Sequence, residues 1–117
     1  MLASREDHIV PWQTAYRTTA LIKGPVRFTL AASGHIAGVI NPAARHKRSH
    51  WIDGRLGGDA EEWLASAQEV PGSWWSDWSA WLKEQAGNTV PARSQLGGPQ
   101  LPEIEPAPGR YVKVQSG

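Results

Sequence analysis

The sequence has no cysteine and no long apolar run, and its charges nearly balance. Without cysteine in 117 residues, a disulfide scaffold, a thiolate metal site and a cysteine nucleophile on this chain are excluded. No run reaches the roughly 18 apolar residues of a membrane-spanning helix. A net charge of +1 and a pI of about 8.2 give no basis for a nucleic-acid partner. Residues 1–10 lack the apolar core of a secretory signal, so the expected location is cytoplasmic.

Tryptophan is the residue in excess. The chain has seven tryptophans, while its 40% hydrophobic and 20% charged residues are typical of a globular protein. A chain of this size buries only roughly 60–65% of its surface, so seven indoles are more than one small core is expected to hide. The excess indicates a piece of something larger.

The N-terminal third predicts a β-α-β unit with a loop after each strand. Residues 3–10 are expected to be a strand end running into a loop, and Pro11 then opens a helical pattern that ends at Gly24. Residues 26–31 alternate apolar and polar side chains, as in a short strand, and residues 33–38 form the second loop. Such a unit implies a parallel sheet, with too few strands here to stand alone. We therefore expect the strand at 26–31 to lack a pairing partner.

The rest of the chain predicts two helices and an irregular tail. Residues 42–58 are polar, basic and irregular, and a capping-box pattern then opens a helix expected over 60–70. A second helix is expected from Ser73 to about Ala86. The Pro/Gly-rich remainder has no periodicity. The expected division is a folded part, residues 1–87, and a tail, residues 88–117.

Asp7 and His35 are the candidate catalytic pair. Each lies in a loop after a predicted strand, acid before histidine, as α/β-hydrolases arrange these two residues along the chain. A catalytic histidine takes the proton of the nucleophile, and a carboxylate on its other nitrogen fixes the tautomer. Spacing alone favours the simpler interpretation, a turn aspartate and an exposed loop histidine.

Four motifs occur in order along the chain. They are residues 5–12 (REDHIVPW), 32–42 (ASGHIAGVINP), 72–78 (GSWWSDW) and 105–113 (EPAPGRYVK). Together they resemble the class I poly(3-hydroxyalkanoate) synthases, which have an α/β-hydrolase core and a Cys-Asp-His triad. The resemblance implies an α/β fold: the C-terminal portion of an α/β-hydrolase, with a partial parallel sheet and helices, incomplete as a stand-alone domain.

The resemblance also implies roles for three residues. Asp7 corresponds to the triad acid and His35 to the triad histidine, and His8 lies beside them as a substrate-binding residue or, alternatively, a packed loop histidine. It implies no metal and no cofactor. The synthases polymerise (R)-3-hydroxyacyl-CoA into polyester and release CoA. Their cysteine lies in a segment that this sequence lacks, so we expect the chain alone to be inactive.

The implied partners are a missing N-terminal half, a second copy in a homodimer of the complete synthase, and the surface of a polyester granule. Two other interpretations stay open: a non-catalytic remnant or module that binds a separate synthase half, and a fragment of another α/β-hydrolase such as an esterase. The basic run at residues 45–50 fits either CoA phosphates or a solvated loop. Trp74, Trp78 and Trp81 share one helix face that fits either packing on a missing sheet or contact with polymer or partner.

Overall fold

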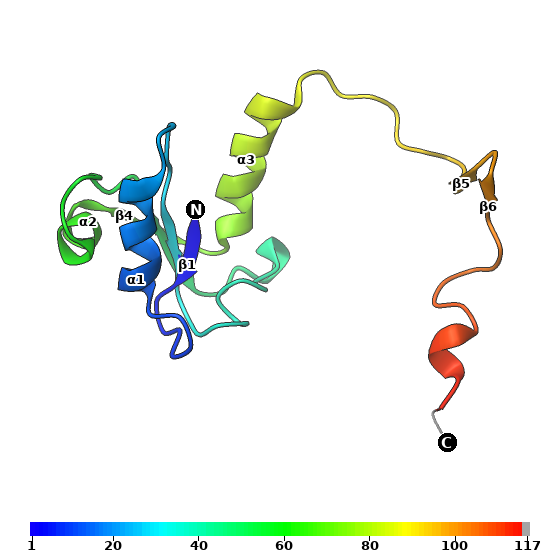
Figure 1. Cartoon of the computed structure of the whole chain (residues 1–117), viewed down its shortest axis with the longest axis horizontal. Helices are drawn as coiled ribbons and strands as arrows, with labels where there is room; N and C mark the ends of the chain where they lie inside the picture. Colours follow the sequence, from blue (N-terminus) through cyan, green and yellow to red (C-terminus); the bar gives the residue numbers. More distant parts are fainter. Residues whose placement is uncertain (116–117) are drawn as a thin grey trace. The chain divides into compact units, whose positions relative to one another are not determined.

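A computed structural model describes residues 1–115, and the chain divides into two units, Met1–Gly87 and Asn88–Gly117. Within the described residues, the first unit contains a four-stranded sheet in the order β1-β2-β3-β4 (Figure 1). Its strands are β1 (Leu2–Ser4), β2 (Thr29–Ala31), β3 (Ser49–Ile52) and β4 (Gln68–Pro71). The second unit contains a short antiparallel pair, β5 (Gly97–Gly98) and β6 (Leu101–Pro102), and a 3₁₀ turn at Tyr111–Lys113.

β1 and β2 form the parallel pair that the β-α-β pattern predicts. Leu2 pairs with Thr29 at the start of the register. The two strands are connected through α1 (Trp12–Arg17), which continues as a 3₁₀ turn at Thr18–Leu21. Pro11 stands directly before α1, where its missing N–H removes no helical hydrogen bond. This unit brings the loop after β1 and the loop after β2 to the same end of the two parallel strands, their carboxyl end.

The prediction of a parallel sheet is wrong beyond this pair, because the sheet is mixed. β3 pairs antiparallel with β2 and with β4. Residues 42–58, expected to be irregular, include β3 and a 3₁₀ turn at Ala43–Arg45. The helix expected over 60–70 is α2 (Ala60–Ser66), which stops early and gives way to β4. The Ser66 hydroxyl donates to the backbone carbonyl of Glu62 at 3.0 Å, as serine side chains do where they compete for helix hydrogen bonds.

The expectation that the strand at 26–31 lacks a partner is also wrong. β2 covers the last three of these residues and is paired on both sides, with β1 and with β3. Phe28 and Leu30 are already buried, with 2% and 0% of their surface exposed. Within residues 1–87, the edges of the sheet are instead β1 and β4.

An aromatic cluster packs α1 and α2 onto the sheet. The ring of Phe28 meets that of Trp63 edge to face at 4.8 Å, and Tyr16 meets Phe28 in the same way at 5.2 Å, an arrangement that aromatic quadrupoles favour. Trp12 and Trp51 are buried in the same core. The core thus accounts for three of the seven tryptophans, and the other four lie on α3.

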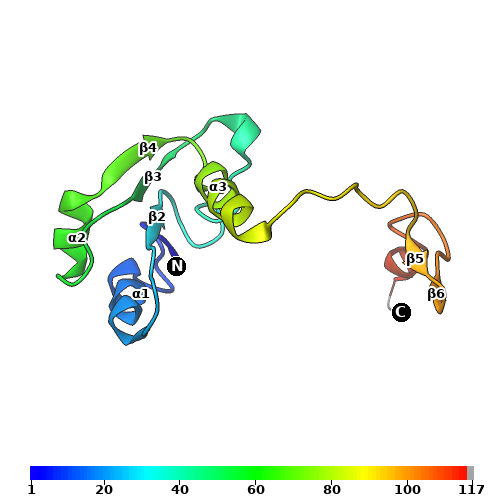
Figure 2. The same cartoon turned by 90° about the horizontal axis from the view of Figure 1, so that it is seen from above.

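The helix expected from Ser73 is confirmed as α3 (Trp74–Ala86). The Ser73 side chain caps it by accepting a hydrogen bond from the Trp75 N–H at 3.0 Å. Seen from two directions, α3 lies on the other side of β1 and β2 from α1 (Figures 1 and 2). Trp78 and Trp81 on α3 remain 47% and 43% exposed. No helix of residues 1–115 is long and apolar enough to cross a membrane.

Candidate active site

The fold brings Asp7 and His35 into direct contact. Asp7 follows β1 and His35 follows β2, so their loops leave two neighbouring parallel strands at the same, carboxyl end. A backbone hydrogen bond from Glu6 N–H to the Ser33 carbonyl, 3.1 Å long, extends the pairing from the strands into the loops. The Nδ1 atom of His35 lies 2.7 Å from Oδ2 of Asp7. The two residues singled out by order along the chain therefore form a hydrogen-bonded dyad.

The Asp7 carboxylate is also held by its own loop. Its Oδ1 atom accepts the backbone N–H groups of Ile9 and Val10, both at 2.9 Å. The Val10 hydrogen bond lowers the pKa of Asp7 most; desolvation opposes it, and His35 and the Ile9 N–H add to it, so that the pKa falls to about 2. An ionised carboxylate only accepts hydrogen bonds. The Nδ1 atom of His35 therefore carries the proton, and the lone pair of the neutral imidazole is on Nε2.

The His35 side chain is more exposed than that of Asp7, as a base that must reach another group requires. The side chain of Asp7 is 8% exposed, whereas that of His35 is 46% exposed. The carboxylate is thus shielded behind the ring, and the imidazole stays accessible. A thiol brought to Nε2 would find a proton acceptor whose tautomer is already fixed.

Of the two glycines near His35, only Gly38 lies where packing leaves no room for a side chain. A Cβ at Gly38 would lie 2.9 Å from Cβ of Ser4 and 3.0 Å from the carbonyl oxygen of Ala32, too close to be accommodated. The nearest atom to a Cβ at Gly34 would be 3.6 Å away, an ordinary contact. The left-handed backbone of this loop falls on Ser33, with φ of 82°. Gly38 therefore lets the His35 loop approach β1 closely, while Gly34 is not required sterically.

His8 and the basic run have separate surroundings. His8 is exposed and its side chain makes no hydrogen bond within residues 1–115. His50, by contrast, is 2% exposed, with Nδ1 donating to the Gly72 carbonyl at 3.1 Å. Arg48 donates to the carbonyl of Ala37. The rest of the run is exposed. Among the described residues, no group of three or more His, Asp or Glu is placed to hold a metal ion.

A link between α3 and the histidine loop was not predicted from the sequence. The indole Nε1 atoms of Trp74 and Trp75 lie 3.2 and 2.9 Å from the carbonyl oxygen of Val39. The signal was present in the sequence, because a tryptophan that is buried in part needs an acceptor for its N–H group. Which acceptor it finds depends on the tertiary fold.

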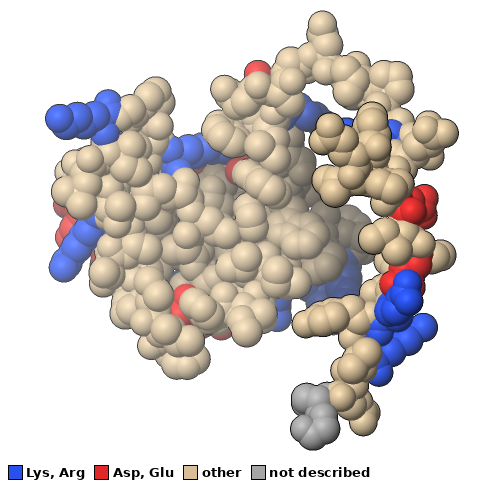
Figure 3. Space-filling view, turned by 45° about the vertical axis from the view of Figure 1, so that its right-hand side comes forward, with Lys and Arg blue, Asp and Glu red and all other residues tan. Residues whose placement is uncertain are grey.

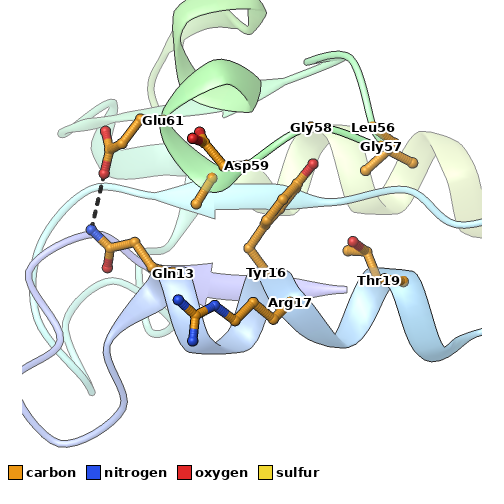
Figure 4. Close-up of a pocket in the computed structure, with 11 residues that line it drawn as sticks. Gln13, Tyr16, Arg17, Thr19, Leu56, Gly57, Gly58, Asp59 and Glu61 are labelled. Atoms are coloured by element: carbon orange, nitrogen blue, oxygen red, sulfur yellow. Dashed lines mark hydrogen bonds between the residues drawn. The ribbon is translucent and has the colours of Figure 1, made fainter.

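One pocket of the described residues lies away from the dyad. It has a volume of about 590 Å³ and separates α1 from the loop and first turn of α2 (Figure 4). A hydrogen bond of 3.1 Å from Gln13 to Glu61 closes one end of it. Neither Asp7 nor His35 lines this pocket, so it offers no route for a substrate to Nε2.

No family model matches the sequence, but several curated proteins do. The chain is 57% identical over 113 residues to the poly(3-hydroxyalkanoate) polymerase subunit PhaC of Cupriavidus necator, a match that covers 97% of the chain. It is 46% identical to the subunit of the same name from Rhizobium meliloti, over 98% of the chain. It is also 46% identical to the poly(3-hydroxyalkanoate) polymerase of Methylorubrum extorquens, again over 98% of the chain.

The chain is homologous to a segment of the poly(3-hydroxyalkanoate) polymerases. The matches cover 19%, 18% and 19% of these three relatives, so the chain spans about one fifth of their length. The resemblance predicted from the four motifs is therefore confirmed. The described structure agrees with it as a small α/β unit with a mixed sheet.

Proposed function

We propose that this polymerase segment supplies the acid and the base of an acyl-transfer centre whose thiol nucleophile comes from another segment. The observation that carries the proposal is the hydrogen bond of 2.7 Å between Asp7 and His35. Its placement after two neighbouring parallel strands supports the α/β-hydrolase arrangement. The hydrogen bond from Nδ1 to the carboxylate leaves Nε2 as the acceptor of the neutral ring, on a side chain that is 46% exposed, and this supports a general base.

In the proposed reaction the substrate is (R)-3-hydroxyacyl-CoA. The Nε2 atom of His35 takes the proton of the incoming cysteine thiol, and the thiolate attacks the thioester carbonyl. The tetrahedral intermediate collapses, and CoA leaves as a thiol after receiving the proton from His35. The hydroxyl of a second acyl group then loses its proton to His35 and attacks the enzyme thioester; the ester bond forms as the carbon–sulfur bond breaks, and His35 returns the proton to the cysteine thiolate. Asp7 keeps the imidazole oriented and stabilises its protonated form.

The outer edge of β1, with which no strand pairs within residues 1–87, is the proposed docking site for the segment that carries the thiol. Beside it lies an apolar groove of about 530 Å³ between the start of the sheet and α3, lined among others by Met1, Leu2, Ile22, Val26, Trp78 and Trp81. Uncharged side chains make up most of the surface of residues 1–87 seen in Figure 3. An open edge beside large exposed apolar side chains favours association. About four fifths of the Cupriavidus necator relative lies outside the part that this segment matches, which makes that remaining chain the natural occupant.

The groove is also compatible with the non-catalytic alternative, a module that only binds another synthase segment. A chain without cysteine that docks through β1 and α3 would equally describe a binding module. The two functions differ in what they require of His35, since a module that only docks does not need its imidazole. The decisive experiment therefore removes the base and leaves the docking surface intact.

The experiment uses a chimera in which this chain replaces the matching segment of the Cupriavidus necator polymerase. We expect the chimera to release CoA from (R)-3-hydroxybutyryl-CoA, and the chain alone to release none. His35→Gln should reduce the release to background, because it removes the proton acceptor. His46→Gln, at an exposed position in the basic run, is the matched control and should keep full activity. Full activity in His35→Gln, or an inactive chimera beside an active parent polymerase, would reject the proposal.

A further inference from the structure

Two adjacent indoles donate to one carbonyl oxygen in the loop that carries His35. Nε1 of Trp75 lies 2.9 Å and Nε1 of Trp74 3.2 Å from the oxygen of Val39. Side chains at successive helix positions point about 100° apart. Packing one face of α3 would therefore not bring both N–H groups to the same atom. Their convergence identifies the Val39 carbonyl as a specific acceptor.

The Val39 carbonyl belongs to the same hydrogen-bonded turn as His35. The Gly38 N–H donates to the Gly34 carbonyl, and the Ile40 N–H donates to the Ile36 carbonyl, both at 2.8 Å. The first bond uses the peptide group that joins Gly34 to His35, and the second uses the peptide group that carries the Val39 carbonyl, so both groups belong to one turn. A force on the Val39 oxygen is therefore transmitted to the backbone of His35.

A third donor acts on the same turn from another element. The guanidinium group of Arg48, next to β3, donates to the Ala37 carbonyl. Side chains from α3 and from the approach to β3 thus hold two carbonyls of the turn. The imidazole of His35 itself is 46% exposed and has little packing to orient it. Its direction depends on the backbone of the turn and on the bond to Asp7.

We propose that Trp74 and Trp75 are positioning residues for His35. Their N–H groups hold the turn so that Nδ1 stays on Asp7 while Nε2 faces the incoming thiol. The inference rests on the proposed function, in which His35 is the base, and adds to it the residues that orient that base. The Val39 oxygen also accepts the backbone N–H of Asn41 at 3.2 Å, so the two indoles share its two lone pairs with a donor of the turn itself. Removing one donor leaves the other in place.

The test measures kcat and KM of the chimera with Trp74→Phe, Trp75→Phe and both together. Phenylalanine keeps an aromatic ring and removes the N–H group. We expect each single variant to lower kcat by about threefold, the scale of one neutral hydrogen bond. The double variant should lower kcat by about 10- to 100-fold, the scale of a misplaced catalytic group. This exceeds the product of the single effects, as expected for donors that share an acceptor. KM should be unchanged.

The matched control is the pair Lys83→Gln and Glu84→Gln on the same helix, at exposed positions outside the docking groove. This pair should leave kcat unchanged. A double variant at Trp74 and Trp75 that keeps parental kcat, or that loses kcat only in proportion to a loss of folded protein, overturns the inference.

A second measurement is independent of catalysis. Hydrogen exchange in peptides covering residues 34–40 of the full chain should accelerate in the double variant at Trp74 and Trp75, and not in the control pair. Unchanged exchange overturns the inference even if the chimera proves inactive. An inactive chimera with accelerated exchange would reject the proposed function and leave the hold on the turn supported.

Discussion

Asp7→Asn separates the two jobs of the Asp7 carboxylate. Oδ1 accepts the N–H groups of Ile9 and Val10 at 2.9 Å, and an asparagine oxygen placed there accepts the same bonds. Oδ2 faces Nδ1 of His35 at 2.7 Å, and the substitution puts an NH₂ group there instead. A donor facing Nδ1 forces that atom to accept, which moves the imidazole proton to Nε2. The loop is preserved while the base is lost.

The expected defect in the chimera is a fall in kcat on the order of 10⁴, the size seen for the same change in a serine-protease triad. CoA release at saturating (R)-3-hydroxybutyryl-CoA measures it, with KM close to that of the parent chimera because docking and loop are unchanged. Asp7→Ala is the comparison, since it also removes both loop hydrogen bonds and should destabilise the loop. A fall in kcat of less than about tenfold for Asp7→Asn would show that Asp7 does not set the tautomer.

Three further predictions concern stability and association. Because folding lowers the pKa of Asp7 from 3.8 to about 2, its stabilising contribution should be complete above about pH 4 and lost as pH falls towards 2; circular dichroism of dilute chain should show this loss, and Asp7→Asn should remove it. Gly38→Ala should destabilise by about 1–3 kcal/mol through its collision with Ser4, whereas Gly34→Ala should change the free energy of unfolding by less than about 1 kcal/mol; equal effects would contradict the packing argument. In sedimentation velocity the isolated chain should self-associate, and the double variant Trp78→Lys, Trp81→Lys should shift it towards monomer. A parent chain that sediments as a monomer refutes this prediction.

The parts of the fold predicted from sequence are those with a local signal. The proline and the helical spacing after it predict α1, and the serine cap predicts α3. β3 and β4 have four residues each, too short for a period to be detected. They exist because their backbones pair with distant residues, as His50 does with Ala31 on one side and Val70 on the other. Such pairing is a property of the assembled sheet, and no single segment encodes it.

In the candidate site, too, some contacts could be predicted from the sequence and others depend on the tertiary fold. The pairing of Asp7 with His35 was predictable because order along a β-α-β unit already determines which loops meet. The hold on the Val39 carbonyl was not, although both indoles belong to a motif that the sequence made conspicuous. Their partner lies 35 and 36 positions earlier in the chain, and only the crossing of α3 over the histidine loop brings them together.

In the proposed centre, this chain and the segment that would complete it contribute unequally, because this chain holds every proposed catalytic group except the thiol. The proposed acid and base and the donors proposed to hold the base all lie within residues 1–87. A thiol brought to Nε2 would meet a preorganised acceptor and would need no rearrangement of the dyad. The dyad without a thiol has nothing to activate. In the proposed mechanism the catalytic step therefore depends on how accurately the edge of β1 and the face of α3 place the partner, which would make the docking surface as much a determinant of rate as the dyad itself.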